Sequence, residues 1–270
     1  MSKDRAGEAR RPILLISASD SSGAAGMQVD VRVVETLKLP LRCALTAVTV
    51  QGDEGVREVF QVSSGVLRSS IRTAMNDSPG ISAVKIGMLV GEETVSAVAD
   101  TLEPAVDQGI PVILDPVVRS TSGSALLDGG GAGVILERLL PLCTVITPNR
   151  EEALWLASKI GKSTSDGEQA ARALLSLGAK SVLVTGGEGP GKLCTDSLFT
   201  SSGPARDFRH PRLPGPVPRG TGCALSSAIA AQLSMGLPLE DAVGQAIVFV
   251  TGLIERSKVI GTQRLLFPTG

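Results

Sequence analysis

Short apolar runs that alternate with segments of helical periodicity constrain the fold of this chain most strongly. The runs are rich in Val, Ile and Leu, have the length of buried strands, and are mostly followed by a small or polar residue. The expected strands are residues 13–16, 43–50, 83–89, 111–114, 143–147 and 181–184. The expected helices are residues 27–39, 64–75, 92–108, 134–140, 150–160, 167–177, 222–235 and 239–255. This alternation predicts an α/β fold: a single-domain, doubly wound, mostly parallel sheet with helices on both faces.

Other segments depart from this alternation. Residues 193–200 and 205–208 resemble two successive strands with no helix between them, which predicts an antiparallel edge on the sheet. Residues 128–133 contain three consecutive glycines, and we expect a mobile loop there. Residues 1–11 are charged and lack an apolar stretch, so we expect a disordered tail followed by one domain over residues 12–270.

Composition excludes several classes of function. The 270 residues carry a net charge of −1 and only 2% aromatic residues, which argues against nucleic acid, an anionic membrane surface and base stacking. No apolar run approaches the roughly 18 residues of a membrane span. Four distant cysteines and one histidine make a structural zinc site improbable and fit a reducing compartment. We therefore expect a soluble, cytoplasmic protein.

A glycine-containing turn before an Ala-rich helix, residues 219–227, is the strongest candidate site. Gly220, Thr221 and Gly222 leave the backbone free to turn its N–H groups inward, and the helix start adds unpaired donors and a partial positive charge. Such a turn favours a phosphate. Cys223 follows in the first turn, where we expect a lowered thiol pKa. The alternative is an ordinary loop-to-helix turn with a buried cysteine.

Polar residues also follow several of the expected strands, where an α/β sheet presents its ligand contacts. The loop of residues 17–26 is small and polar, and Asp30 one turn later either faces a ligand hydroxyl or is a solvated acid. Gln51 either reads an amino-pyrimidine edge or caps a turn. Asp115 either neighbours a metal or phosphate or simply precedes Pro116 in a turn.

Two further features are interpreted as ordinary structure. Asn149 is a good N-cap, and acids in the turn after it are favoured whatever their function. Residues 186–192 match the spacing of a phosphate-binding GxxxxGK loop. However, Leu193 stands where Ser or Thr is required, and a strand rather than a helix is expected next. We expect a glycine-rich hairpin near a nucleotide instead, and a surface position for His210.

Seven segments, taken together and in order, resemble the hydroxymethylpyrimidine/phosphomethylpyrimidine kinases of the ribokinase-like superfamily. The segments are residues 16–30, 44–55, 85–89, 114–117 with 122–123, 147–149 with 152, 186–187, and 220–223. The resemblance covers residues 13–255. The assignment to this branch rests mostly on the Gly-Thr-Gly-Cys sequence of residues 220–223, because many relatives have Asp in place of the Cys.

The resemblance implies phosphorylation of 4-amino-5-hydroxymethyl-2-methylpyrimidine by ATP in thiamine synthesis, followed by phosphorylation of the monophosphate. By motif position it places Gly220, Thr221, Gly222 and Cys223 in the anion hole, with Cys223 nearest the attacking hydroxyl. It places Asp30, Gln51, Met88 and Val117 around the pyrimidine. It places Asp115 and Glu152 beside Mg²⁺, and Asn149, Thr185 and Gly187 beside the nucleotide. By analogy with the family, the chain would form a homodimer.

The sequence departs from the family at four positions. Thr185 and Ile247 replace lysines that lie on the phosphate side, Arg219 replaces His or Asn, and Ala18 replaces Gly. These departures leave two alternatives open: a kinase of the same fold acting on pyridoxal, or a sensor that binds the pyrimidine and has lost turnover.

Overall fold

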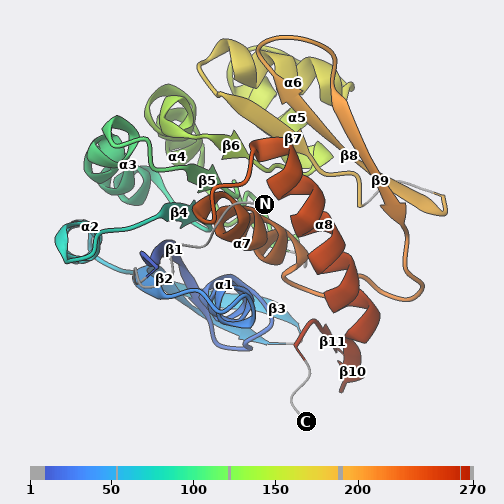
Figure 1. The fold of residues 1–270 in the computed structure, drawn as a ribbon, viewed down its shortest axis with the longest axis horizontal. Helices are drawn as coiled ribbons and strands as arrows, with labels where there is room; N and C mark the ends of the chain where they lie inside the picture. The colour runs from blue at the N-terminus through green and yellow to red at the C-terminus, as the bar shows by residue number, and fades with distance from the viewer. Residues whose placement is uncertain (1–9, 53, 121–122, 188–190, 262, 268–270) are drawn as a thin grey trace.

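Nine strands form one sheet in the order β3-β2-β1-β4-β5-β6-β7-β8-β9 in the computed structural model, which describes residues 10–52, 54–120, 123–187, 191–261 and 263–267 (Figure 1). The strands are β1 (Ile13–Asp20), β2 (Leu41–Gly52), β3 (Gly55–Gln61), β4 (Ala83–Ile86), β5 (Val112–Leu114), β6 (Val145–Ile146), β7 (Ser181–Val184), β8 (Leu193–Thr200) and β9 (Arg206–Pro211). The six strands from β2 to β7 in this order are parallel to one another, whereas β3 is antiparallel to β2. The expected α/β class and its antiparallel β8–β9 edge are confirmed.

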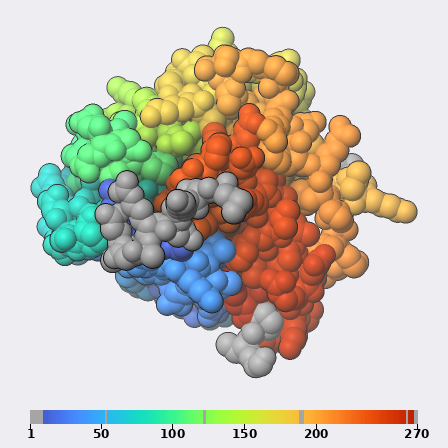
Figure 2. Space-filling model, in the orientation of Figure 1, coloured from blue at the N-terminus to red at the C-terminus, as the bar shows by residue number. Residues whose placement is uncertain are grey.

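Helices cover both faces of the sheet and enclose two apolar cores. One core lies under α1 (Gly26–Thr36), α7 (Thr221–Ser234) and α8 (Leu239–Arg256). The other lies under α2 (Ser64–Asn76), α3 (Glu92–Asp107), α4 (Gly129–Val134), α5 (Arg150–Lys159) and α6 (Gly167–Ser176). In the space-filling view, α8 forms a band on the molecular surface (Figure 2). The buried strands are apolar on both sides because each side meets a helix layer.

The structure differs from the sequence expectations at several elements. β1 runs on to Asp20, so the first polar residues belong to the strand itself. β3 was not anticipated. The three glycines form the start of α4 rather than a mobile loop, because the Asp128 carboxylate accepts a hydrogen bond from the Gly131 amide at 2.6 Å and caps the helix. Two short strands, β10 (Lys258–Ile260) and β11 (Gln263–Leu265), follow α8, where the sequence pattern predicts neither helix nor strand.

The segment after Leu140 and the ends of the chain add little to the site. A π-helical turn (Ile135–Leu139) and a 3₁₀ turn (Leu140–Leu142) continue α4 toward β6. Most of the tail expected at residues 1–11 lies outside the described residues, and the extent of the domain stays a prediction. Among the described residues, no helix combines the length and the apolar character that a membrane crossing requires.

Candidate active site

The site lies where the six parallel strands end together. Their carboxyl ends share one edge of the sheet, and the order reverses between β1 and β4, because the chain first goes out to β2 and then returns. A reversal of this kind opens a crevice at the strand ends. Gln51 lies at the end of β2, Met88 follows β4, and Asp115 follows β5. Asn149 follows β6 and pairs with Thr185, which follows β7.

A cavity of about 590 Å³, here called the polar pocket, occupies this crevice. Its lining contains twelve of the thirteen residues that the sequence indicated. These are Gln51, Met88, Asp115, Val117, Asn149, Glu152, Thr185, Gly187, Gly220, Thr221, Gly222 and Cys223. Side chains that are up to 172 residues apart in the chain, from Gln51 to Cys223, thus meet in one place because the topology brings the strand ends together.

The start of α7 forms one wall of the polar pocket. Gly220 is the N-cap residue, with φ of 80° in the left-handed region. A Cβ atom at Gly220 would come within 2.5 Å of the Ala24 carbonyl oxygen, so both the angle and the close approach require glycine. The first-turn residues Thr221, Gly222 and Cys223 line the cavity, and the unpaired amides of a helix start favour an anion.

The Cys223 thiol does not have the lowered pKa expected at a helix start. Burial raises its pKa to about 12, and the Lys85 ammonium and the Gly26 amide only partly oppose this, while Asp115 and Asp30 raise it further. Desolvation of the charged form outweighs the partial charge of the helix. The thiol is therefore protonated at neutral pH, and it shares a hydrogen bond with the Asp115 carboxylate.

Asp115 is a pocket carboxylate with a raised pKa. Burial raises its pKa to about 6, and Lys85 partly opposes the shift. The Ser226 hydroxyl of α7 donates to Asp115 Oδ2 at 3.3 Å, so the carboxylate is also fixed to the helix that carries Cys223.

Asp30 is the one expected site residue that the structure does not bring to the polar pocket. Its carboxylate is fully buried beneath the pocket, where Lys85 Nζ donates to both oxygens at 2.8 Å and the Ser227 hydroxyl donates to Oδ1 at 2.8 Å. Burial alone would lower the pKa of Lys85, but Asp30, Cys223 and Asp115 together raise it. Asp30 therefore holds a buried cation under the thiol rather than a ligand.

Glu152 and Asn149 form a capping box at the start of α5. Asn149 Oδ1 accepts from the Glu152 amide at 2.8 Å, and Glu152 Oε2 accepts from the Asn149 amide at 3.0 Å. Glu152 Oε1 also accepts from the Val118 amide at 3.3 Å. The expected N-cap is confirmed, and the box fixes Glu152 against the loop that follows Asp115.

The other side of the polar pocket is suited to an apolar ring with a polar edge. Met88 packs with Ala18, Ala47 and Leu126 in a small buried cluster, against which Val117 also packs. The Gln51 backbone is held by Ser21, whose Oγ accepts from the Gln51 amide at 2.8 Å and donates to the Gln51 carbonyl at 3.0 Å. An apolar wall thus lies beside a carboxamide that both donates and accepts.

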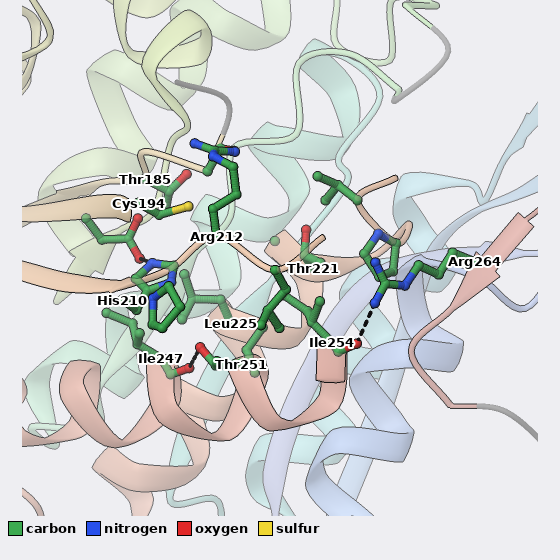
Figure 3. Close-up of a pocket in the computed structure, with 18 residues that line it drawn as sticks. Thr185, Cys194, His210, Arg212, Thr221, Leu225, Ile247, Thr251, Ile254 and Arg264 are labelled. Carbon is green, nitrogen blue, oxygen red and sulfur yellow. Dashed lines mark hydrogen bonds and ion pairs between the residues drawn. The ribbon is translucent and has the colours of Figure 1, made fainter. Parts of the chain in front are cut away.

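A second cavity, here called the apolar pocket, adjoins the polar pocket. It lies between α7, α8 and the β8–β9 hairpin, and Leu225, Ile247 and Ile254 contribute to its lining (Figure 3). His210 lines this pocket and is paired with Asp196 at 3.1 Å, and its side chain is 21% exposed, so the expected surface position holds only in part. The chain pairs β8 and β9 along their length, which turns the His210 side chain inward.

Sequence reasoning did not single out Lys85 or Arg212, and it included Ser17 only as part of the polar loop of residues 17–26. Lys85 lies in an apolar strand, and nothing in its neighbourhood signals a partner 55 residues away. Ser17 is buried at the polar pocket, and its hydroxyl has no partner among the described residues. Arg212 precedes a proline-rich stretch for which the sequence predicts only an extended chain and no binding role. The sole available signal was a polar residue inside an apolar run, which marks Lys85 and Ser17 but not Arg212.

A doubly wound sheet with a glycine-containing helix start at its carboxyl edge, next to an apolar cavity, fits a phosphotransferase of the ribokinase-like fold class. The family model described as phosphomethylpyrimidine kinase matches residues 20–267. The chain belongs to this phosphomethylpyrimidine kinase family and is a kinase.

Three relatives show the extent of the similarity. A hydroxymethylpyrimidine/phosphomethylpyrimidine kinase of Aquifex aeolicus is 36% identical over 248 residues, which are 92% of this chain and 96% of the relative. The crystal structure of phosphomethylpyrimidine kinase from Clostridium difficile 630 has a TM-score of 0.74 at 29% identity, covering 90% and 99% of the two chains. An ADP complex of Bacillus subtilis pyridoxal kinase has a TM-score of 0.84 at 29% identity, covering 95% and 96%. The fold is thus common to kinases of both rings.

Proposed function

We propose that this kinase transfers the γ-phosphoryl group of ATP to the hydroxymethyl group of 4-amino-5-hydroxymethyl-2-methylpyrimidine, and then phosphorylates the monophosphate. The observation that carries the proposal is the polar pocket, where the anion-binding start of α7 faces an apolar wall and the Gln51 carboxamide. Family membership and the sequence similarity to pyrimidine kinases support the substrate.

The ring would bind between Met88 and Val117, with Gln51 reading its amino edge. A carboxamide can accept from the exocyclic amine and donate to a ring nitrogen at the same time. Met88 supplies an adaptable apolar contact. This placement directs the hydroxymethyl group to the helix start, where Cys223 lines the same pocket.

Transfer of the phosphoryl group needs alignment and stabilisation of charge more than covalent help. The substrate oxygen forms a bond to the γ-phosphorus as the bond from that phosphorus to the β–γ bridging oxygen breaks, and ADP leaves. The amides at the start of α7 would stabilise the negative charge on the transferring group without reorganising. The hydroxyl proton passes to the Cys223 sulfur as the thiol proton moves to Asp115, whose pKa of about 6 suits an acceptor.

Mg²⁺ is implied by the family, and the residues present fit a metal that arrives with the nucleotide. Asp115 and Glu152 both line the polar pocket and provide the hard oxygen ligands that Mg²⁺ prefers. Among the described residues no group of three or more metal-ligating side chains occurs. Both carboxylates also accept hydrogen bonds from the protein. We therefore expect Asp115 and Glu152 to hold Mg²⁺ through water, with phosphate oxygens completing its shell.

One assay tests the proposal. ADP formation is measured with the hydroxymethylpyrimidine, its monophosphate and pyridoxal in parallel, with Mg²⁺ and with a chelator. We expect turnover on both pyrimidines that the chelator abolishes. Turnover on pyridoxal alone would favour the other ring kinase, and tight pyrimidine binding without ADP formation would favour a sensor. The homodimer stays a prediction, which sedimentation would check.

A further inference from the structure

Arg212 lies at the junction of the two cavities, directly after β9. Seven described residues line both the polar and the apolar pocket: Thr185, Gly187, Arg212, Val217, Pro218, Thr221 and Gly222. Among these seven, Arg212 has the charged side chain. Figure 3 shows it between Thr185 and Thr221, with its guanidinium on the Thr185 side. A ligand that extends from one pocket to the other must therefore pass this guanidinium.

The Arg212 side chain is held in place by the backbone around the glycine-rich turn. Nη1 donates to the Gly187 carbonyl at 2.6 Å, and Nε donates to the Gly191 carbonyl at 2.8 Å. The Arg212 amide also donates to the Lys192 carbonyl at 2.9 Å. Because a guanidinium is planar and rigid, these two side-chain bonds fix the direction of its third nitrogen.

The third nitrogen, Nη2, is buried and has no hydrogen-bond partner among the described residues. No carboxylate of the described chain forms an ion pair with Arg212, in contrast to Arg219, whose Nη2 lies 3.6 Å from Asp20. A buried charged donor without a partner is costly, and such groups in native proteins mark places that a ligand, an ion or water completes.

The neighbouring groups indicate which ligand is missing. Thr221 and Gly222 belong to the amide-rich start of α7 and line the same junction. Thr185 and Ile247 bring no charge to it. A guanidinium edge and helix amides that converge on one passage favour a phosphate oxygen, and an arginine edge suits phosphate geometry.

We propose that Arg212 is the nucleotide-phosphate contact of this kinase: its fixed Nη2–H edge binds a phosphate oxygen of ATP where the nucleotide passes from the apolar to the polar pocket. This inference rests on the proposed function and names a residue for it. Arg212 thereby supplies the positive charge that Thr185 and Ile247 lack, and its bonds to the Gly187 and Gly191 carbonyls set its position.

The test compares ligands that differ only in phosphate. Binding of ADP, a non-hydrolysable ATP analogue and adenosine is measured by calorimetry for the natural chain, Arg212→Met and Arg212→Lys. We expect Arg212→Met to weaken ADP and the analogue about 10- to 100-fold and adenosine less than about 2-fold. Arg212→Lys keeps the charge but loses the rigid, planar guanidinium. Its affinities for ADP and for the ATP analogue should lie between those of the natural chain and those of Arg212→Met. Arg209→Met is the matched control, because Arg209 is an exposed residue of β9 outside both pockets, and should leave all three affinities unchanged.

Equal weakening of adenosine and ADP would overturn the inference, because it would mean that Arg212 only holds the turn. Unchanged ADP affinity in Arg212→Met would also overturn it. If Arg212→Met fails to fold, the ratio of ADP to adenosine affinity in Arg212→Lys decides by the same criterion. These measurements need no pyrimidine turnover. A natural chain that binds ADP but phosphorylates no pyrimidine would contradict the proposed function alone.

Discussion

Cys223 and Asp115 interact directly, although burial is the largest cause of the raised pKa of each. The half-buried thiol in the first turn of α7 donates to the buried carboxylate that follows β5. A reading of residues 219–227 alone located the thiol correctly but gave its pKa the wrong direction. The burial that raises it comes from strands and helices elsewhere in the chain, which no local pattern reveals.

Replacement of the carboxylate should change stability in a pH-dependent way. The pKa of Asp115 rises from 3.8 to about 6, so its protonated form is favoured in the folded state. The group stabilises the fold fully below about pH 4, and this contribution is lost as pH rises through 6. Asp115→Asn should therefore be more stable than the natural chain at pH 8, by about 3 kcal/mol at most, and by only about 1 kcal/mol at pH 4.5.

Urea unfolding at both pH values measures this effect. Asp107→Asn, at an exposed position of α3, is the control and should show the same small difference at each pH. An Asp115→Asn effect that is equal at pH 8 and pH 4.5 would contradict the raised pKa. Turnover of Asp115→Asn should fall as well, because the proton acceptor is lost.

Removal of the thiol should separate turnover from binding. Cys223→Ala should lower kcat about 100-fold, the range of a missing proton-transfer group, while the dissociation constant for the pyrimidine changes little. Steady-state kinetics and calorimetry check the two quantities. Cys43→Ala is the control, since Cys43 is exposed and is not part of the pocket lining. Unchanged kcat in Cys223→Ala would remove the thiol from the mechanism.

Elements with a strong local signal were predicted best. β7 begins and ends at the predicted residues, and Asn149 caps α5 as its residue type indicates. α4 was missed because three glycines disfavour a helix locally, whereas Asp128 and packing on α3 overcome that preference. β3 was missed because it is mostly exposed and lacks the apolar pattern of a buried strand.

At Gly220, the N-cap residue of α7, the addition of a single methyl group should lower the free energy of unfolding. Gly220→Ala must accept a positive φ and a contact of 2.5 Å with the Ala24 carbonyl, whereas Gly236→Ala meets a φ of 83° in open space. We expect Gly236→Ala to cost about 1–2 kcal/mol of unfolding free energy and Gly220→Ala clearly more. Gly220→Ala should also lose nucleotide affinity. Thermal unfolding measures both variants, and equal losses would show that the close approach to Ala24 is unimportant.

Across the whole molecule, the buried pair of Lys85 and Asp30 joins the sheet to two helices. Lys85 belongs to β4, Asp30 to α1, and Ser227 of α7 completes the bonds to the carboxylate. The alternation of strands and helices in the sequence predicts a doubly wound, mostly parallel sheet. A contact between residues 55 positions apart is not predictable in this way, since it depends on strand order and helix rotation together.

Breaking this pair should destabilise the fold strongly. Lys85→Met leaves a buried carboxylate without its cation and should cost about 3–5 kcal/mol of unfolding free energy. The double variant Lys85→Met/Asp30→Asn removes both charges and should recover much of the loss. Denaturant unfolding of the natural chain and the two variants gives the comparison. A double variant as unstable as the single one would show that lost packing, not the stranded charge, is responsible.

The late position of α7 has a consequence for synthesis on the ribosome. The apolar side chains of Ile13, Leu15, Ala83 and Ile113 belong to the core that α7 and α8 cover. The strands that carry them are made about 100 residues or more before α7 begins at Thr221. A nascent chain therefore leaves the part of this sheet face that α7 and α8 cover exposed until most of its length has been translated. A chaperone that protects this apolar surface would have to stay bound until both helices have been made.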